Sequence, residues 1–585
     1  MSNPTSTALG ELRRLLPYVR KYKRLTVWGL VFITLSNVCS TTIPRVVGRT
    51  IDTVKVSTFT TSDIAWLIAQ ILLLTIGSGL FMFATRRTII VMSRYVEEDL
   101  RNNFVRSIKD QSQRFFHERS TGSLLAHFSN DISAVREFIG PAIMYTANTI
   151  TTFAFALSWM VSLNGWLTLA ILIPVPLVAT LTYKLGKKIH ENYKRVQEQF
   201  EHITTQSQET ASGIRVVRAY VRGEFEADTF NEFSKDYYRK NMRLARVQSL
   251  MMPGMTVLFN LSYIIVIGAG GYLVIQSMLT VGELTQFFIY LNQLLWPIAA
   301  IGWVTSMIQR GAASMARLAA LSETPALIRD PNAPYSGTVA GNVTFENVSL
   351  QYNETDTVLN SISFHVPAGQ SLGIVGAVGS GKSSLIGLLP RLYDVSSGRV
   401  LVDGVDVRQY SLATLRGSIA VVPQEAFLFS DTLRENIRFG NPTASNEEVE
   451  NAARMAQIDT EIRELPDGYD TIVGERGVTL SGGQKQRTSL ARAIASDPEI
   501  LILDDALSAI DADTEERILR NLDQVMKDRT TLVISHRIST VRKCSSIIVL
   551  QHGVIAEQGT HDQLVELGGL YADMFQRQQL EQQLS

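Results

Sequence analysis

Long stretches without a charged side chain constrain this 585-residue chain more than any other feature of its sequence. Asp, Glu, Lys and Arg are absent from residues 25–44, 64–85, 138–183, 247–282 and 284–309. A helix needs about 20 apolar residues to cross roughly 30 Å of hydrocarbon, so residues 138–183 suffice for two helices joined by a turn near Asn164. The pattern predicts six membrane spans, at about residues 25–47, 64–92, 138–162, 166–185, 250–277 and 284–309.

Charge divides the chain into two regions of different chemistry. The net charge is zero, but residues 1–330 contain 34 Lys and Arg against 22 Asp and Glu. Residues 331–585 contain 21 against 33. Such an asymmetry indicates that the two halves form separate domains in different surroundings.

The loops between the predicted spans indicate their orientation. The tail 1–24 and the segments 94–136 and 184–246 are basic, whereas the loops near Asn164 and Ser277 contain no Lys or Arg. Because basic loops stay in the cytoplasm, we expect a multi-pass protein of the cell membrane whose N-terminus and C-terminal half are cytoplasmic. The first outer loop runs against the rule, since it carries three basic residues, Arg45, Arg49 and Lys55.

The two long cytoplasmic segments have a helical pattern, so the spans are expected to continue beyond the bilayer. Small and polar residues interrupt the pattern at residues 119–122 and 211–213. A helix that breaks at such a point can turn and run parallel to the membrane. Each turn would then offer a contact surface to another domain.

The second half alternates short apolar runs with helical segments, which indicates an α/β domain with a mainly parallel central sheet. Residues 322–341 are rich in Pro, Ala, Ser and Gly, as is typical of a linker. The predicted fold class is therefore an N-terminal all-α polytopic membrane domain followed by a C-terminal α/β P-loop nucleotide hydrolase domain. The predicted domains are a tail (1–24), a transmembrane domain (25–321), the linker (322–341) and a nucleotide-binding domain (342–578).

A phosphate-binding loop follows the apolar strand 372–375. The GxxxxGK[ST] pattern, in which glycines let backbone N–H groups close around phosphates and a new helix presents its positive end, predicts a nucleotide site. Lys382 would hold the β- and γ-phosphates, and Ser383 would hold Mg²⁺. The predicted ATP-binding residues of this loop are Gly376, Ala377, Val378, Gly379, Ser380, Gly381, Lys382, Ser383 and Ser384.

Two further motifs accompany this loop. The apolar run 500–503 ends at Asp504, which is the arrangement that places a carboxylate near a nucleotide's metal ion. A second helix begins after a loop, and its N-terminal N–H groups can bind another phosphate. The residues at this second helix end are Leu480, Ser481, Gly482, Gly483 and Gln484.

The order of these motifs, completed by Gln424 and His536, resembles the ATP-binding cassette, and the sequence LSGGQ is close to diagnostic of it. With six spans ahead of the cassette, the chain resembles a half-transporter of the ABC exporter family. The likeness is greatest to the degenerate-site subunit of a heterodimeric bacterial multidrug-type exporter. It implies ATP and Mg²⁺ as cofactors. The implied partners are a second half-transporter subunit, membrane lipids and a small amphipathic substrate, but no nucleic acid.

The resemblance also implies roles for individual residues. Tyr352 would stack on adenine, and residues 480–484 would contact the nucleotide held by the opposite subunit. The turns near residues 121–122 and 212–213 would be the coupling helices. The implied metal ligands are Ser383, Gln424 and Asp504; the implied catalytic residues are Asp505, His536 and Gln424; the implied loop between the two sites contains Ser508 and Asp511.

One position departs from the family pattern. The Glu that usually follows the magnesium Asp and polarises the attacking water is here Asp505. A side chain one methylene shorter moves the carboxylate by about 1.5 Å, and displacements of about 1 Å can slow a reaction ~10²-fold. We therefore expect Asp505 to be a poor general base. A heterodimer with one competent site, completed by this chain's signature, is favoured over a homodimer that hydrolyses slowly at two equal sites.

The expected function is ATP-driven export of a hydrophobic or amphipathic substrate, such as a drug, a lipid or a peptide, by alternating access. A homodimeric lipid flippase is the first alternative. An ATP-gated channel would instead produce single-channel currents. A non-transport cassette ATPase of the DNA-repair or translation type would be soluble without detergent, which the six predicted spans argue against.

Overall fold

The computed structural model describes residues 10–55, 60–353, 356–510 and 512–584, and it divides into two compact units. One unit consists of the chain up to Lys109 together with Thr121–Thr324. The other consists of Asp110–Ser120 and Pro325–Ser585. The first is helical and the second is α/β, so the predicted fold class is confirmed.

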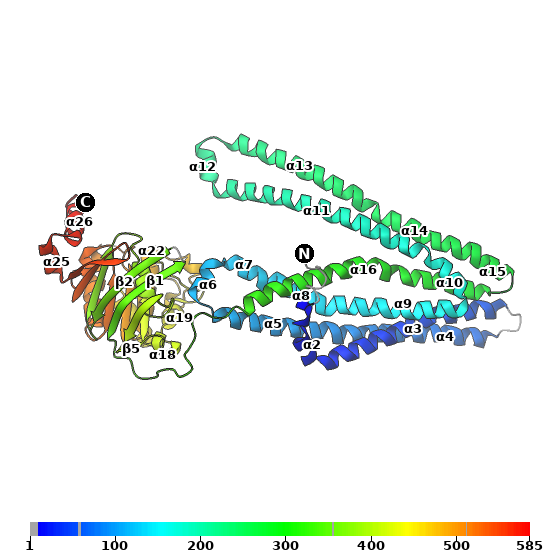
Figure 1. Ribbon diagram of the computed structural model, residues 1–585, viewed down its shortest axis with the longest axis horizontal. Helices are drawn as coiled ribbons and strands as arrows, with labels where there is room; N and C mark the ends of the chain where they lie inside the picture. The colour runs from blue at the N-terminus through cyan, green and yellow to red at the C-terminus, as the bar shows by residue number, and fades with distance from the viewer. Residues whose placement is uncertain (1–9, 56–59, 354–355, 511, 585) are drawn as a thin grey trace. The chain divides into compact units, whose positions relative to one another are not determined.

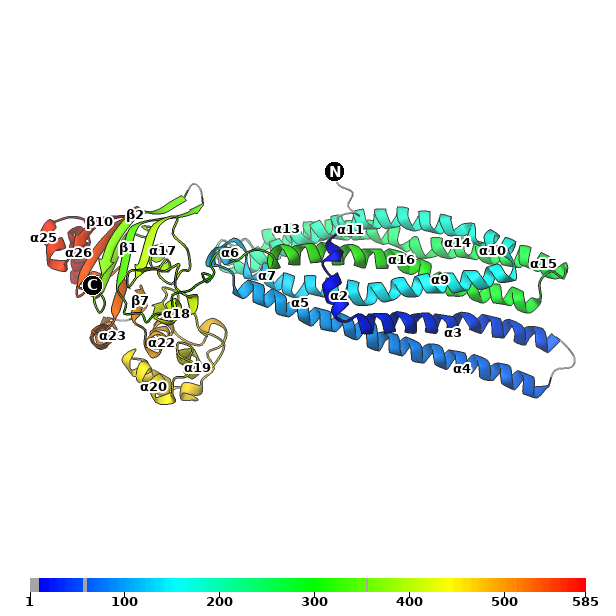
Figure 2. The ribbon, with the colours of Figure 1, turned by 60° about the horizontal axis from the view of Figure 1, so that its bottom comes forward.

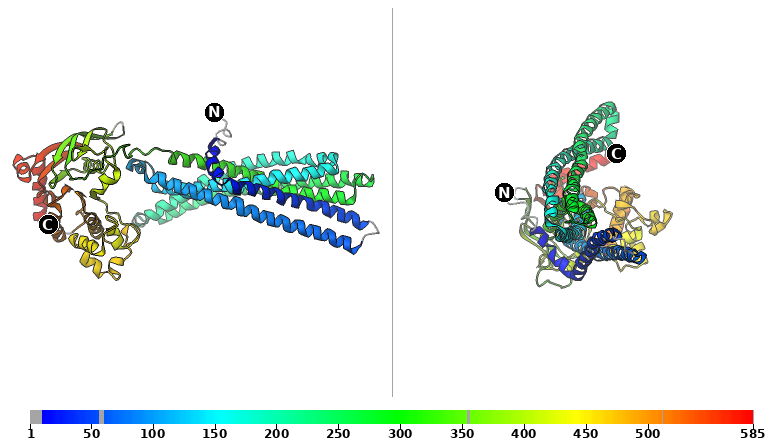
Figure 3. Two further views of the ribbon diagram at one scale, coloured as in Figure 1. Left: turned by 90° about the horizontal axis from the view of Figure 1, so that it is seen from below. Right: turned by 90° about the vertical axis from the view of Figure 1, so that its right-hand side faces the viewer.

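The helical unit is built from long, largely antiparallel helices (Figures 1 and 3). Within the described residues, five helices are long and apolar enough to cross a membrane: Lys23–Lys55, Thr61–Lys109, Gly165–Ser212, Gly223–Ile275 and Val281–Ser322. They have between 33 and 53 residues. Because about 20 residues cross the hydrocarbon layer, each helix is longer than a span requires.

Local changes of helical geometry divide three of these five helices into shorter elements, whereas Lys23–Lys55 and Val281–Ser322 are each one continuous helix. The elements of the unit are α2 (Leu16–Lys21), α3 (Lys23–Lys55), α4 (Thr61–Thr85), η1 (Arg86–Ile90), α5 (Val91–Lys109), α7 (Thr121–Ala126), η2 (His127–Asp131), α8 (Ile132–Glu137), η3 (Phe138–Ala142), α9 (Ile143–Leu163), α10 (Gly165–Leu172), α11 (Pro174–Ser212), α12 (Ile214–Ala219), α13 (Gly223–Ser249), α14 (Met251–Ile265), η4 (Val266–Gly270), α15 (Gly271–Ile275) and α16 (Val281–Ser322).

The third predicted span, 138–162, coincides with η3 and α9, which are not among the five apolar helices. Helix α9 is uncharged, but polar side chains interrupt its first half. One of them pairs with α3, where buried Asn37 donates to Thr151 Oγ1 at 2.5 Å and to the Asn148 carbonyl at 3.3 Å. The polar face of α9 thus packs against another helix. The count of six spans stays a prediction.

Helices α3 and α16 approach closely at the end where α16 begins. Thr280 caps α16, and the Asp52 carboxylate accepts from the Thr280 hydroxyl at 2.6 Å and from Gly282 N–H at 2.9 Å. A Cβ at Gly282 would lie 2.1 Å from the Gly48 carbonyl oxygen, so this packing requires glycine. Asp52 therefore joins α3 to the start of α16 through one hydroxyl group and one N–H group of the first helical turn.

Two short helices lie near the predicted cytoplasmic turns. Helix α6 (Gln113–Glu118) precedes the predicted break, and extended backbone at Arg119 separates it from α7. Helix α12 follows Gly213 and connects α11 to α13. In Figure 1 the end of this hairpin that carries α12 diverges from the other helices of its unit. Its tip is solvent-exposed, with Tyr220 at 76% and Val221 at 88%.

The α/β unit contains two sheets. The six-stranded sheet has the order β10-β9-β3-β8-β7-β6, in which all neighbours are parallel except β9 and β10. The four-stranded sheet has the order β2-β1-β4-β5 and is antiparallel. The strands are β1 (Val343–Asn353), β2 (Asp356–Val366), β3 (Ser371–Gly376), β4 (Ser397–Val402), β5 (Val405–Asp406), β6 (Ile419–Val422), β7 (Ile500–Asp504), β8 (Thr530–Ile534), β9 (Ser546–Gln551) and β10 (Val554–Gly559).

Helices of the α/β unit gather in two places. In Figure 2, α19, α20 and α22 lie together away from β1 and β2, whereas α25 and α26 lie beside β10. The main helices are α17 (Lys382–Gly387), α18 (Leu412–Gly417), α19 (Leu433–Arg438), α20 (Asn446–Met455), α21 (Asp459–Glu464), α22 (Gly482–Ala495), α23 (Ala512–Met526), α24 (Ile538–Val541), α25 (His561–Leu567) and α26 (Leu570–Leu584).

The predicted linker 322–341 has little regular structure, but much of it lies along the α/β unit. The Asp330 carboxylate accepts from the Leu412 N–H at 2.6 Å, and the Tyr335 N–H donates to the Gln409 carbonyl at 2.8 Å. Ile328 is buried. These contacts hold the segment in place after α16 ends at Ser322.

Candidate nucleotide-binding site

Four parallel strands bring the predicted site residues to one edge of the six-stranded sheet. Strands β3, β8, β7 and β6 are neighbours, and the loops after their carboxyl ends meet there. They surround a cavity of about 300 Å³. The residues that line it are Val358, Val378, Gly379, Gly381, Lys382, Ser383, Ser384, Gln424, Asp504, Asp505, Ile534 and His536.

The loop between β3 and α17 has a conformation that only glycine adopts easily. Gly379 and Gly381 have φ angles of 81° and 99°. A Cβ at Gly381 would lie 2.9 Å from Leu359 Cδ2 and 3.0 Å from the Val358 carbonyl oxygen. The glycines thus let the backbone curve closely around the cavity before α17 begins at Lys382.

Lys382 lies inside this loop. Its ammonium group donates to the carbonyl oxygens of Gly376 at 2.9 Å and Ala377 at 2.8 Å. Burial lowers the pKa of Lys382, and the nearby carboxylates of Asp504 and Asp505 oppose that shift. The side chain is therefore buried beside the cavity, and within the described residues its hydrogen bonds go to two backbone carbonyl oxygens.

Asp504 and Ser383 both line the cavity and carry oxygen atoms of the kind that would hold a divalent cation. Burial raises the pKa of Asp504, while a hydrogen bond from Ser383 and the charges of Lys382 and His536 oppose the rise. Ser380 Oγ, in the same loop, is buried and has no partner in the described part of the chain. A hard cation such as Mg²⁺ prefers these oxygen donors and usually completes its shell with water and substrate phosphates. The residues thus fit Mg²⁺ bound together with a nucleotide.

Asp505 lies at the carboxyl end of β7 in a left-handed backbone conformation, with φ of 49°. Its N–H donates to the Ile534 carbonyl at 2.9 Å, and its Oδ1 accepts from the His536 N–H at 3.4 Å. The carboxylate is 8% exposed and faces the loop after β8. One of its carboxylate oxygens therefore already accepts a hydrogen bond from the backbone of the loop that carries His536.

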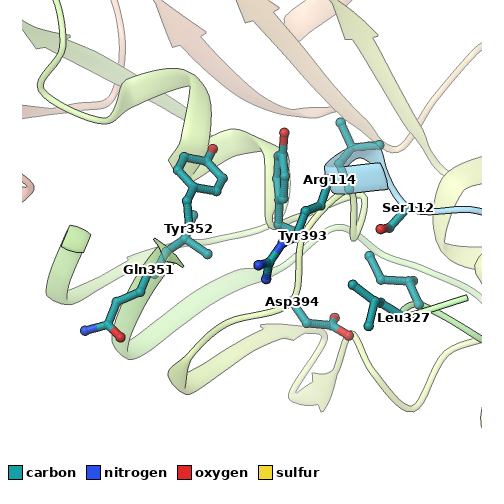
Figure 4. Close-up of a pocket in the computed structure, with 10 residues that line it drawn as sticks. Ser112, Arg114, Leu327, Gln351, Tyr352, Tyr393 and Asp394 are labelled. Atoms are coloured by element: carbon teal, nitrogen blue, oxygen red, sulfur yellow. The ribbon is translucent and has the colours of Figure 1, made fainter. Parts of the chain in front are cut away.

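Tyr352 lies in a neighbouring hollow at the end of β1. Its hydroxyl donates to Ser384 Oγ at 3.0 Å, and its ring packs edge-on against Tyr393 with centroids 5.2 Å apart (Figure 4). Burial, together with Tyr352, raises the pKa of Tyr393 to about 12. The Tyr393 hydroxyl lies 3.2 Å from His117 Nδ1 in α6. Tyr352 is thus connected to the phosphate loop on one side and to α6 on the other.

The predicted signature begins α22 and does not line the described cavity. Ser481 caps this helix by accepting from the Gln484 N–H, and Gln484 Nε2 donates to Glu461 at 2.9 Å. Ser481 and Gly482 are exposed. Ser508 accepts from Gln486 Nε2 at 3.0 Å, so α22 also holds the loop after β7. Asp511 lies outside the described residues.

Several residues that line the cavity or contact the residues around it were not predicted from the sequence. Val358 comes from β2, a strand that the apolar pattern does not reveal, and Ile534 is the last residue of β8. Tyr393 and Gln486 act through contacts with residues distant in the chain. Only the YD pair at 393–394 after the phosphate-loop helix, an aromatic residue in a polar turn, could have drawn attention to Tyr393.

The sequence is similar to known transporters over nearly its whole length. YheI of Bacillus subtilis, named a probable multidrug resistance ABC transporter ATP-binding/permease protein, is 37% identical over 560 residues, which are 94% of this chain and 95% of that protein. The chain belongs to the ABC transporter family. Family models match the transporter at residues 26–298, as the ABC transporter transmembrane region, and at residues 359–508, as ABC transporter.

Other relatives agree with this assignment. The multidrug resistance-like ATP-binding protein MdlA of Escherichia coli is 36% identical, covering 96% of each chain. The ATP-dependent lipid A-core flippase of Desulfotalea psychrophila is 34% identical over 82% of this chain and 84% of its own length. A solved structure of a bacterial Atm1-family ABC exporter with ATP bound has a TM-score of 0.79 and 29% identity, covering 95% of this chain and 98% of that one.

This ABC transporter is therefore a multi-pass membrane protein that fuses a transmembrane region and an ATP-binding domain in one chain, as a half-transporter does. It couples ATP hydrolysis to export across the membrane. ABC exporters work as dimers, so a second subunit is part of the functional assembly.

Proposed function

We propose that this chain is the degenerate-site half of a heterodimeric exporter that moves a small hydrophobic or amphipathic substrate out of the cell. Two relatives named for multidrug resistance support a substrate of this kind. The basic segments between the spans support a cytoplasmic position for the N-terminal tail and the ATP-binding domain.

Asp505 is the observation that carries the heterodimer proposal. Its side chain is one methylene shorter than that of Glu, and its carboxylate accepts from the His536 N–H at the edge of the cavity that Asp505 lines. A general base must reach within hydrogen-bonding distance of the proton that it takes. Asp505 is therefore a weak base in this chain's own site, and the partner's Glu would act in the other site.

The position of the signature supports a site shared between two chains. The N-terminus of α22 is exposed at Ser481 and Gly482, and its N–H groups are free to meet a phosphate from outside the chain. The cavity beside Lys382 would in turn receive the partner's signature. In this arrangement Lys382 binds phosphates, Ser383, Gln424 and Asp504 hold Mg²⁺, which neutralises phosphate charge, and His536 contacts the γ-phosphate.

Two exposed apolar surfaces support an exchange of contacts between subunits. One is the α12 tip, where Val216, Tyr220 and Val221 are exposed. The other lies just after Gln424, where Phe427, Phe429 and Phe439 pack together yet remain 41–59% exposed. Exposed apolar clusters of this kind commonly mark interaction sites. We assign the α12 tip to a contact with the partner's ATP-binding domain, which would transmit the closure of the two domains to the spans.

A homodimeric lipid flippase is the second candidate, because one relative is named as an ATP-dependent lipid A-core flippase. Purification of the tagged chain from its native membrane, followed by mass spectrometry, distinguishes the heterodimeric exporter from the homodimeric flippase. The heterodimer proposal expects an equimolar second cassette protein with Glu at the position of Asp505. Recovery of the chain only with copies of itself, with ATP-driven lipid transfer in vesicles, would favour the flippase.

A further inference from the structure

The backbone of the loop that carries His536 is held by a side chain from the last helix of the chain. Gln578, in α26, donates from Nε2 to the His536 carbonyl at 2.5 Å. Its Oε1 accepts from the Ile538 N–H at 2.8 Å. One amide side chain thus binds both sides of the His536–Arg537–Ile538 turn, 40 to 42 residues away in sequence.

Helix α26 is held in place by contacts that fix the position of Gln578 relative to the His536 loop. Glu557 accepts from the N–H groups of Leu570 and Tyr571, the first residues of the helix. Tyr571 is fully buried, and its hydroxyl lies 2.8 Å from His561 Nδ1. Phe575 and Gln578 follow at the i+4 and i+7 positions, so they share the face of Tyr571 that packs on the domain. The core therefore fixes where Gln578 can reach.

The same loop is held on two other sides. The His536 N–H donates to Asp505, as described above. The Arg537 guanidinium pairs with the buried carboxylate of Glu515 in α23, which also accepts from Thr540 Oγ1 at 3.0 Å. Asp505 lines the nucleotide cavity and Glu515 belongs to α23, whereas the contact from Gln578 comes from the C-terminal helix α26.

Helix capping explains only one of the two hydrogen bonds that Gln578 makes. Ile538 begins α24, and its N-cap residue, Arg537, makes no side-chain cap, so Gln578 Oε1 supplies the missing acceptor. The donation from Nε2 to the His536 carbonyl does nothing for α24. It holds the peptide group that follows His536, a residue that lines the cavity.

We propose that Gln578 is a positioning residue for ATP binding, which acts by holding the His536 backbone so that the imidazole faces the cavity. The proposal rests on the role of His536 proposed above. It makes the C-terminal helix part of the nucleotide site, although no atom of α26 lines the described cavity. Both hydrogen bonds are needed, one for the α24 cap and one for the histidine peptide.

The test uses the full-length transporter, purified with its partner subunit. Two quantities are measured: the ATP concentration that gives half-maximal photolabelling of this chain with an azido-ATP probe, and hydrogen exchange of the peptide containing residues 536–538. The variants are Gln578→Ala and Gln578→Glu, with His536→Ala as reference. Gln579→Ala is the matched control, because Gln579 is the next residue of α26 and is exposed.

In Gln578→Ala we expect the half-maximal ATP concentration to rise about three- to tenfold, as the loss of one or two partly buried hydrogen bonds implies. Exchange at the Ile538 amide should accelerate. In Gln578→Glu, the carboxylate still accepts from Ile538 but cannot donate to the His536 carbonyl. That variant should therefore keep the Ile538 protection and yet lose ATP affinity. Gln579→Ala should change neither quantity.

This pattern separates positioning from simple packing. If Gln578 only capped α24, Gln578→Glu would bind ATP as the wild type does, and the proposal would be overturned. It would also be overturned if His536→Ala weakened labelling while both Gln578 variants labelled normally. Unchanged labelling in His536→Ala would instead refute the role assigned to His536, and the inference would fall with it.

Discussion

Arg317 in α16 donates from Nε to the Asp131 carboxylate in η2 at 3.0 Å, and the two residues are 186 positions apart. Asp131 is 6% exposed and also accepts from Ser314 Oγ at 2.9 Å. His127 Nδ1 lies 2.6 Å from the same carboxylate. The contact joins the C-terminal part of α16, which is followed in the chain by the ATP-binding domain, to the helix that follows α7.

Asp131→Asn should destabilise the helical unit. The substitution removes a nearly buried charge whose partner, Arg317, is half-exposed, so we expect a loss of about 1.5–3 kcal/mol, the range for hydrogen bonds to charged groups. Thermal unfolding in detergent at neutral pH measures it. Glu137→Gln is the comparison, because Glu137 meets Arg310 at 3.6 Å in an exposed pair that should contribute little. Equal shifts in the two variants would contradict the expectation.

The same carboxylate predicts a pH dependence. Burial opposes ionisation of Asp131, but hydrogen bonds from Arg317, His127 and Ser314 outweigh it and lower the pKa below its usual value of 3.8. A lowered pKa stabilises the folded state above the unfolded pKa, and this contribution is lost as the pH falls through the folded pKa. The difference in unfolding temperature between wild type and Asp131→Asn should be constant above about pH 5 and shrink below about pH 4. A difference that shrinks near neutral pH would contradict this assignment.

Lys382→Ala should weaken ATP binding at this chain's own site. A charge-assisted contact to phosphate is worth about 1.5–3 kcal/mol, which corresponds to roughly 10- to 150-fold in affinity. Photolabelling of this chain across a range of ATP concentrations measures the change. Lys543→Ala is the control, since it removes an exposed ion pair with Asp523. Undiminished labelling at low ATP would show that the phosphate-loop assignment is wrong.

Charge reversal on α12 should uncouple ATP hydrolysis from substrate transport. Arg215 and Arg218 are exposed on this helix, so Arg215→Glu combined with Arg218→Glu should leave folding and most ATPase activity intact while lowering substrate transport in vesicles. Glu232→Lys reverses a charge on the same hairpin, within α13 and away from its tip, and should transport normally. Parallel loss of ATPase and transport, with the fold intact, would mean that α12 is not a coupling element.

The sequence revealed those parts of the molecule that depend on local patterns. The glycines and Lys382 of the phosphate loop follow an apolar strand, and Asp504 ends another, so parallel strands must bring them together. Strand β2 was not predicted, because Asn360, Ser361 and Ser363 leave it without a continuous apolar run and its pairing with β1 contains register shifts. Gln578 was missed for another reason: its partners lie 40 to 42 residues away, and no local pattern marks such a contact.

Asp505→Asn distinguishes a homodimer with two equally active ATP sites from a heterodimer with one active and one degenerate site. If the partner's Glu performs hydrolysis, this change removes a base that contributes little, and steady-state ATPase should stay within about twofold of wild type. In a homodimer the same change neutralises the only base at both sites, so turnover should stop. Asp505→Glu adds the missing methylene, and in the heterodimer it should raise ATPase by giving this chain's own site a base of the usual length.

Gly483→Asp in the same chain should lower ATPase activity strongly, whereas Asp505→Asn should lower it only slightly. The new carboxylate would stand at the N-terminus of α22, where backbone N–H groups are expected to meet the phosphate at the partner's competent site. A Cβ at this position would also lie 3.0 Å from the Ala509 carbonyl oxygen, so the loop after β7 must shift. We expect at least a tenfold loss of ATPase, or about 1.4 kcal/mol of barrier. Near-complete loss of hydrolysis in Asp505→Asn, with ATP binding and assembly intact, would refute the heterodimer proposal, because it would show that the shorter carboxylate still positions the attacking water.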